Sequence, residues 1–219
     1  MSSEEESLED GPDPLNPDEV YPLVLAAGAS SRMGSPKAAL DFGGQTALAR
    51  ILETCSDLGL GDPVVVTGAH PDETRQAAGT CPARFVRNAA WEAGRTGSLL
   101  RGLRAIPGDA VAVLLWPVDA CLPGLEVLTE LVAALTSAPK AQAAVPCHEG
   151  RRGHPLLIGA DALPRFMDLD PEASARDLVR ALAEEGRLAH VEVSDPSVLM
   201  NCNTPSDYRR WDRQARLRR

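Results

Sequence analysis

The sequence contains very little lysine. Of its 22 basic residues, only Lys37 and Lys140 are lysine and the other 20 are arginine. In a chain that uses arginine this heavily, a lysine inside a loop of small residues stands out from an ordinary surface charge. Its ammonium group is a compact point charge that suits phosphate groups. Lys37 is therefore a candidate phosphate-binding residue, with an exposed turn lysine as the alternative.

Paired cysteines are also missing. The five cysteines are dispersed, without C-x-x-C spacing: Cys55, Cys81, Cys121, Cys147 and Cys202. An odd, dispersed set indicates reduced thiols in a cytoplasmic protein and suggests no zinc site. No apolar run reaches 18 residues, so we expect no membrane span and no membrane partner. The stretch 1–6 has neither the basic nor the apolar region of a signal peptide.

Charge is unevenly distributed. The net charge is −9, but residues 1–19 hold eight acidic and no basic side chains, so the remainder is close to neutral. We expect 1–19 to be a disordered acidic tail, 20–208 to be a single domain, and 209–219 to be a basic helix or tail. That basic end lacks interleaved aromatic residues, so we predict a solvated helix and no nucleic-acid partner.

Strands and helices are predicted to alternate. Apolar runs indicate strands at 23–27, 62–68, 83–87, 111–119, 141–146 and 188–193, and a turn at 147–155 leading into a further strand. Helical spacing covers 46–58, 71–78 and 125–135, and another helix begins near 96–98. This pattern predicts an α/β fold, a three-layer α/β/α sandwich with a mostly parallel, Rossmann-like mixed sheet.

The loop after the first strand fits neither common phosphate-binding motif. Residues 26–31 do not supply G-x-G-x-x-G, and Lys37 lies between Pro36 and Ala38 instead of in the Gly-Lys-Ser/Thr of a P-loop. Small residues after a buried strand nevertheless leave backbone N–H groups free to cradle phosphate oxygens. The loop is therefore predicted to hold a triphosphate.

Residues 25–37 match every specified position of L-A-A-G-x-S-x-R-M-G-x-P-K. This resembles the signature of the nucleotidyltransferases related to molybdenum cofactor guanylyl- and cytidylyltransferases, whose fold is of the nucleotide-diphospho-sugar transferase type. The resemblance implies that Arg32 and Lys37 act in catalysis. It implies a nucleotide-binding set of Leu25, Ala26, Ala27, Gly28, Ala29, Ser30, Arg32 and Lys37. Ala27, where guanine-reading members carry glycine, implies that the nucleotide is CTP.

A second resemblance covers residues 88–103, which are similar to the family segment N-x-x-W-x-x-G-x-x-x-S-L-x-x-G-L. In the family this loop contacts nucleobase and ribose, and the resemblance adds Thr67, Asn88 and Ser98 to the nucleotide-binding set. The start of the helix near Thr96 would also offer N–H groups to an anion. Two interpretations of Trp91 remain open: its side chain contacts the ligand, or it packs as an aromatic residue at the rim of the surface.

Two oxygen donors are candidate Mg²⁺ ligands. Asp119 follows the most apolar predicted strand, at the sheet edge where open α/β sheets bind ligands. The family element also ends in a metal-binding aspartate, and residues 201–207 resemble the family ending in which Asn203 completes the metal shell. The alternative is that Asp119 caps the helix after Pro123 and Asn203 caps a helix beside Thr204.

The last resemblance concerns a second substrate. Arg152, Gly153, His154 and Pro155 resemble the loop that binds it in the family, although solvated turn arginines are the alternative. The implied reaction transfers a nucleoside monophosphate to a phosphate monoester, molybdopterin, and releases pyrophosphate. The resemblance also implies a molybdenum hydroxylase as a protein partner. The alternatives are transfer to a sugar phosphate or another small alcohol phosphate, and a non-catalytic nucleotide-binding protein that delivers a cofactor.

Overall fold

The computed structural model describes residues 15–217 of the 219, so most of the predicted acidic tail and the last two residues lie outside the description. The strands are β1 (Val20–Ala26), β2 (Val64–Thr67), β3 (Arg84–Arg87), β4 (Ala112–Pro117), β5 (Ala143–His148), β6 (Arg151–Arg152), β7 (Leu156–Gly159) and β8 (Leu188–Glu192). The α-helices are α1 (Ala47–Asp57), α2 (Pro71–Ala77), α3 (Arg95–Leu103), α4 (Leu125–Ser137), α5 (Leu163–Met167), α6 (Ala175–Glu184) and α7 (Pro205–Leu217). None of these helices is both long and apolar enough to cross a bilayer.

All eight strands belong to one mixed sheet. Its order is β3-β2-β1-β4-β7-β5-β6, and β8 pairs with β5. The first half is parallel, because β1 pairs in parallel with both β2 and β4 and β2 pairs in parallel with β3. The strand β7 is antiparallel to both of its neighbours, β4 and β5. The predicted α/β fold with a mixed sheet is confirmed.

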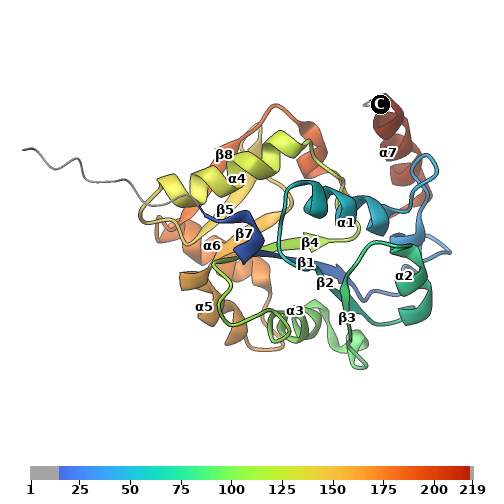
Figure 1. Cartoon of the computed structure of the whole chain (residues 1–219), viewed down its shortest axis with the longest axis horizontal. Helices are drawn as coiled ribbons and strands as arrows, with labels where there is room; N and C mark the ends of the chain where they lie inside the picture. The colour runs from blue at the N-terminus through green and yellow to red at the C-terminus, as the bar shows by residue number, and fades with distance from the viewer. Residues whose placement is uncertain (1–14, 218–219) are drawn as a thin grey trace, which may run out of the picture.

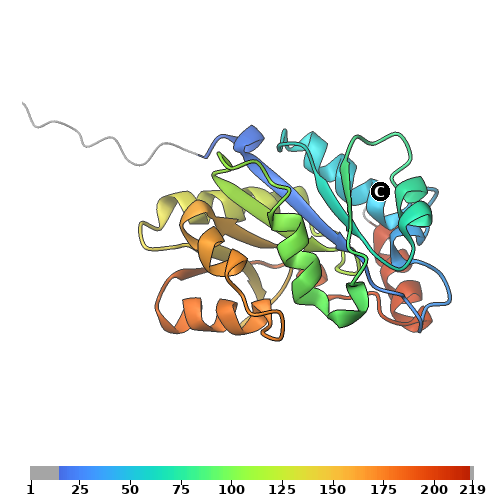
Figure 2. The ribbon, with the colours of Figure 1, turned by 90° about the horizontal axis from the view of Figure 1, so that it is seen from below.

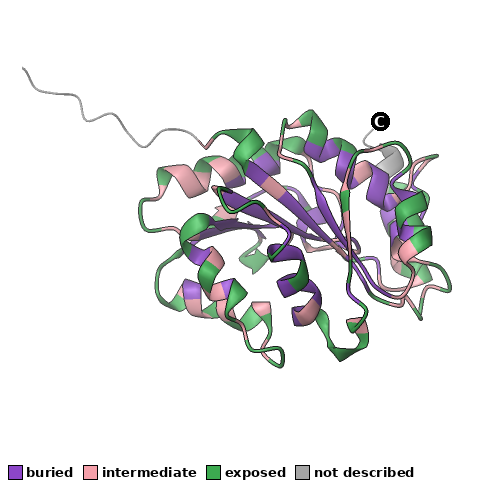
Figure 3. Cartoon of the chain, turned by 60° about the horizontal axis from the view of Figure 1, so that its bottom comes forward, coloured by how far each residue is buried: buried purple, intermediate pink, exposed green. Residues whose placement is uncertain are grey.

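Helices cover both faces of the sheet (Figure 1). On one face, Leu48 and Ile51 of α1 and Leu131 of α4 pack with Val24 and Trp116. The opposite face is covered by α3, α5 and α6, as Figure 2 shows, with Leu99, Phe166 and Leu182 among the side chains that bury Leu23 and Val113. Figure 3 shows the strands buried between exposed outer helix surfaces. Adjacent residues of β1 thus point into different cores, which explains its uninterrupted apolar sequence.

The central strand β1 begins at Val20, three residues earlier than predicted, because Pro22 lies inside the strand and does not mark its start. Pro22 lies opposite Leu114 of β4, whereas pairing with β2 begins one residue later, at Leu23. A proline is tolerated in a sheet where no neighbouring strand needs its missing N–H group. The carboxyl end of β1 lies one residue before the predicted end and leads directly into the candidate phosphate loop.

Close packing of α3 on the sheet gives a stability prediction. A Cβ atom on Gly102 would lie 2.4 Å from Leu23 Cδ1 and 2.8 Å from Val66 Cγ2, both in the core. Gly102→Ala should therefore lower the free energy of unfolding by about 1–3 kcal/mol through overpacking. Gly97, in the same helix, is the matched control, since its Cβ would meet only Asn88 Nδ2 at 3.8 Å. Gly97→Ala should raise stability by about 0.5–1 kcal/mol. Urea denaturation measures both, and equal effects would contradict the packing argument.

Candidate active site

A pocket of about 310 Å³ opens at the carboxyl ends of β1 and β4. Its walls come from the loop after β1, from α2, from the start of α3 and from the residues after β4. The lining residues are Leu25, Ala26, Ala27, Gly28, Ser30, Pro36, Lys37, Ala38, His70, Thr74, Trp91, Glu92, Gly94, Arg95, Ser98, Pro117, Val118 and Asp119. The loops that follow parallel strands all lie at the same edge of the sheet. Segments that are distant in sequence therefore meet at this pocket.

The loop after β1 is held in a defined shape. Ser30 has a φ of 55°, and its carbonyl oxygen accepts a 2.8 Å hydrogen bond from the N–H of Met33. The Ser30 hydroxyl oxygen accepts a hydrogen bond from the backbone N–H of Lys37 at 3.1 Å. On the other side, His70 Nε2 lies 3.0 Å from the carbonyl oxygen of Ala29. These contacts fix the position of Lys37 relative to the end of β1.

Lys37 joins the two predicted metal ligands. Its Nζ atom lies 2.8 Å from Asp119 Oδ2 and 2.7 Å from Asn203 Oδ1. The Lys37 and Asp119 side chains are 14% and 18% exposed, so this ion pair lies at the wall of the pocket, partly shielded from water. Charges in such a setting interact more strongly than they do in bulk water. Asp119 and Asn203, which come from distant parts of the sequence, therefore face one point in space.

Backbone contacts bring the two ligand segments together. The N–H of Cys202 donates to the carbonyl oxygen of Asp119 at 2.7 Å, and the N–H of Cys121 donates to that of Met200 at 2.9 Å. These bonds run beside an antiparallel bridge between residues 120 and 201. Because Asn203 follows this bridge by two residues, its amide reaches the lysine that Asp119 also binds.

The alternative roles as helix caps belong to other residues. The N-cap of α4 is Gly124, so Asp119 does not cap that helix. At the start of α7, Asp207 Oδ2 accepts hydrogen bonds from the N–H of Thr204 at 2.8 Å and from that of Asn203 at 3.1 Å. These bonds lower the pKa of Asp207, with the Thr204 hydroxyl as the largest contributor. The Asn203 side chain does not line the pocket itself; its Oδ1 accepts a hydrogen bond from Lys37, which does.

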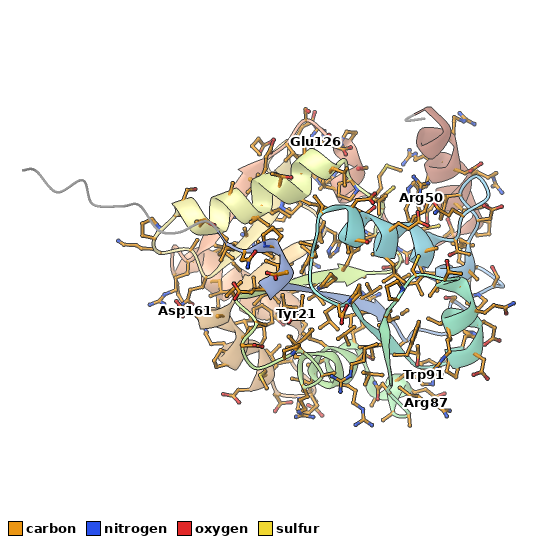
Figure 4. All side chains as sticks on the ribbon, in the orientation of Figure 1. Tyr21, Arg50, Arg87, Trp91, Glu126 and Asp161 are labelled. Atoms are coloured by element: carbon orange, nitrogen blue, oxygen red, sulfur yellow. The ribbon has the colours of Figure 1, made fainter. Side chains whose placement is uncertain are left out.

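The start of α3 forms the far wall of the pocket. Gly94, with a φ of 128°, is the N-cap of α3 and has no side chain to satisfy the first N–H groups. Trp91 lies on the loop between β3 and α3 and lines the pocket (Figure 4). Asn88 is buried and donates to Ser98 Oγ at 2.9 Å, while its Oδ1 accepts from the N–H of Ala90 at 3.1 Å. Asn88 therefore stabilises the loop between β3 and α3 through these hydrogen bonds and does not itself line the pocket.

Several predicted site residues do not line this pocket. Arg32 is exposed, and Thr67 is buried beneath the wall. Ala29 contributes its carbonyl to His70, as described above. Arg152 Nε lies 3.1 Å from Nε2 of His190, on β8. The lining also includes residues that the sequence did not single out: His70, Thr74, Glu92 and Arg95.

The four residues of the loop predicted to bind the second substrate differ in what surrounds them. Gly153 packs closely on the backbone of Val198, and the N–H of His154 donates to the carbonyl oxygen of Val198 at 2.8 Å. Pro155 is buried and joined to His154 by a cis peptide bond. His154 lies within electrostatic range of Asp119 and Arg95. Of the four predicted residues, His154 is thus the one linked electrostatically to the candidate metal ligand.

Burial gives His154 a pH-dependent role in stability. Desolvation lowers its pKa below the ordinary value of 6.5, Arg95 lowers it further, and Asp119 acts in the opposite direction. The unfolded chain therefore binds this proton first as the pH falls. The stability from neutral His154 should be fully present above about pH 6.5 and should be lost as the pH falls toward the lower folded-state pKa.

The pH prediction is tested with His154→Gln. Unfolding free energies of the wild type and the variant should show a smaller loss below pH 6.5 in the variant. His190 also has a lowered pKa, through desolvation and Arg152, and it adds a loss of the same sign to both proteins. Identical pH slopes for the wild type and the variant would contradict the role assigned to His154.

A second pocket, of about 590 Å³, involves the basic end of the chain. Its lining includes Arg151 of β6, Leu199 of η5 (Pro196–Leu199), and Arg210, Trp211 and Arg213 of α7. The predicted boundary between residues 208 and 209 falls inside α7, which begins at Pro205. No disulfide joins any of the five cysteines, all of which lie within the described residues, and burial raises the pKa of Cys55 to about 12 and that of Cys202 to about 11. Both thiols are therefore protonated at neutral pH.

The fold is that of the nucleotidyltransferases. A solved nucleotidyl transferase from Methanothermobacter thermautotroptrophicus superposes with a TM-score of 0.78 at 27% identity, covering 91% of this chain and 99% of that one. A family model, the MobA-like NTP transferase domain, matches residues 22–188, and the chain belongs to this family.

Two proteins of known name are similar in sequence to this chain. A protein named nicotine blue oxidoreductase, from Paenarthrobacter nicotinovorans, is 33% identical over 171 residues, which cover 72% of this chain and 80% of the relative. A molybdenum cofactor guanylyltransferase from Sinorhizobium fredii is 65% identical over 34 residues, 16% of each chain. The family is thus shown over most of the chain, whereas the similarity to the guanylyltransferase is confined to a short segment.

Proposed function

We propose that this nucleotidyltransferase joins CMP from CTP to a phosphate monoester, with molybdopterin as the favoured acceptor, and releases pyrophosphate. The observation that carries the proposal is the convergence of Lys37, Asp119 and Asn203 at the end of the phosphate loop. In the reaction, an oxygen of the acceptor phosphate attacks the α-phosphorus, and the bond from that phosphorus to the bridging oxygen of the β-phosphate breaks. A molybdenum hydroxylase would then be a downstream partner.

The protein's own residues align and neutralise the two anions. The backbone N–H groups of residues 28–32 and the side chains of Arg32 and Lys37 are assigned to the triphosphate. The start of α3, with Ser98 and Arg95 in the pocket wall, is assigned to the nucleoside side. Holding acceptor and triphosphate in line converts an encounter between two anions into a reaction within one complex. His154 is assigned to the acceptor side because of its proximity to Asp119.

The donor set fits magnesium. Asp119 and Asn203 offer a carboxylate and an amide oxygen, and Mg²⁺ is commonly held by one or two such groups together with substrate phosphates. Within residues 15–217, no three His, Cys, Asp or Glu side chains form a metal-binding cluster. When bound, the ion neutralises charge on the phosphate oxygens.

The preference for CTP rests on the end of β1. Ala27 is buried and lines the pocket with Leu25 and Ala26. Its methyl group narrows the space for a base relative to glycine, which favours a pyrimidine. Ala27→Gly should shift the ratio of kcat/KM for CTP over GTP toward GTP by about tenfold, on the order of what a methyl group discriminates in a pocket. An unchanged ratio would remove Ala27 from the specificity argument.

The overall test combines the protein and Mg²⁺ with each of the four ribonucleoside triphosphates, with and without molybdopterin. Pyrophosphate release only with CTP and molybdopterin together is the expected result. Release with a sugar phosphate or another small alcohol phosphate in place of molybdopterin would instead support a different acceptor. Nucleotide binding without pyrophosphate in any pairing would favour a non-catalytic delivery protein. Because one relative is named an oxidoreductase, oxidation of NAD(P)H is followed in parallel.

A further inference from the structure

The ammonium group of Lys37 lies between the two oxygen atoms assigned above to the metal. Both contacts, to Asp119 Oδ2 and to Asn203 Oδ1, have hydrogen-bond lengths, 2.8 Å and 2.7 Å. We propose that Lys37 is a resident cation of this site, which keeps free divalent ions out until a metal–triphosphate complex binds. The inference rests on the proposed function, since it concerns the same phosphate and metal site.

The resident position is well supported by its surroundings. The backbone of Lys37 is held by Ser30 Oγ, and the lysine side chain is only 14% exposed. The ammonium group satisfies an acceptor on each of Asp119 and Asn203 and balances the carboxylate charge. Both oxygen donors assigned to the metal therefore already have a cationic partner in Lys37.

A free divalent ion would have to displace the ammonium group. Magnesium needs oxygen ligands at roughly 2.0–2.1 Å, which places it in the space that Lys37 Nζ fills. The two positive charges repel each other at such separations. Displacement without another anion would leave the lysine charge partly buried and without a counter-charge, which is unfavourable.

A triphosphate removes this obstacle. Lys37 and Ser30 line the same pocket as the loop residue Gly28, so phosphate oxygens bound there would offer Lys37 a new partner. Asp119 and Asn203 are then free to bind the ion that the nucleotide brings. Metal and nucleotide should consequently bind with positive coupling, each raising the affinity for the other.

The test measures Mn²⁺ binding to the full chain by EPR, without turnover. Lys37→Met and Lys37→Gln should bind Mn²⁺ alone about tenfold or more tightly than the wild type, within the range typical of coupled sites. Lys140→Met, which changes the other lysine of the chain, is the matched control and should leave the affinity unchanged. A non-hydrolysable CTP analogue should tighten Mn²⁺ binding to the wild type more than to Lys37→Met.

A double variant locates the ion. Lys37→Met combined with Asn203→Ala should lose the gain in Mn²⁺ affinity. Equal Mn²⁺ affinities of the wild type and both folded Lys37 variants would overturn the inference, and so would a gain that persists in the double variant. These outcomes are separate from the proposed function. If the gain is found but no pyrophosphate forms with any substrate pair, the exchange of cations stands and the proposed reaction fails.

Discussion

Turnover of the Asp119→Ala variant is expected to fall by a factor of about 100 or more, as it does when a charge partner of the transition state is removed. Within residues 15–217, this carboxylate is the acidic group that forms an ion pair with Lys37. Its loss removes both the balancing charge for the lysine and an assigned metal ligand. Pyrophosphate release under saturating CTP measures the effect.

The fold of this variant should be intact. The bond that joins the two ligand segments uses the carbonyl oxygen of Asp119, which alanine retains. Far-UV circular dichroism and thermal unfolding check this point. Asp109→Ala changes an exposed aspartate in the turn before β4 and should leave turnover unchanged. A near-normal rate for Asp119→Ala would defeat the assignment of this residue.

Lys37→Ala is expected to lower turnover by a similar factor, about 100 or more, because it removes the positive charge assigned to the triphosphate. The loop should keep its shape, since the contact with Ser30 Oγ uses the backbone N–H of residue 37. Lys140→Ala is the control for loss of a lysine. Pyrophosphate release is again the measurement.

The two variants should not be additive. Lys37 and Asp119 are in direct contact, and residues that act as a unit show large coupling energies. The double variant Lys37→Ala/Asp119→Ala should therefore be only slightly slower than either single variant. A rate lower than both by a further factor of about 100 would show that the two residues act independently.

Much of the sheet could be predicted from the sequence, because parallel strands that are buried on both faces consist of uninterrupted apolar residues. The strand before the phosphate loop and the one before Asp119 end within two residues of their predicted ends. Since parallel neighbours place their carboxyl ends at one edge, the meeting of Lys37 with Asp119 follows from strand order. The family signature supplied the assignment to a nucleotidyltransferase.

Other features depend on packing that no local pattern records. The antiparallel strand β7 lies between β4 and β5, although it follows them both in the chain. Arg152, which the resemblance assigns to the second substrate, contacts His190 on a strand 38 residues later in the chain. Nothing in the sequence of β8 signals that contact.

The position of Arg95 in the sequence does point to a role in the pocket. It is the first residue of α3, where a positive side chain opposes the helix dipole. A cation in that position indicates that an anion is expected nearby, and Arg95 indeed lines the pocket. Thr74 lies on α2, and His70 is the N-cap residue just before that helix, whose bounds agree with the prediction to within one residue. Which face of α2 meets the pocket depends on tertiary structure. The roles of all these residues in catalysis stay predictions.

The bond from Lys37 to Asn203 spans 166 residues of sequence. A ribosome therefore synthesises the loop after β1, the proposed phosphate loop, long before it adds the asparagine that is proposed to complete the site. A nascent chain that folds β1 and its loop early would still lack that proposed metal ligand. Incomplete translation products should consequently be unable to consume nucleotide, so activity would appear only once nearly all of the domain has been made.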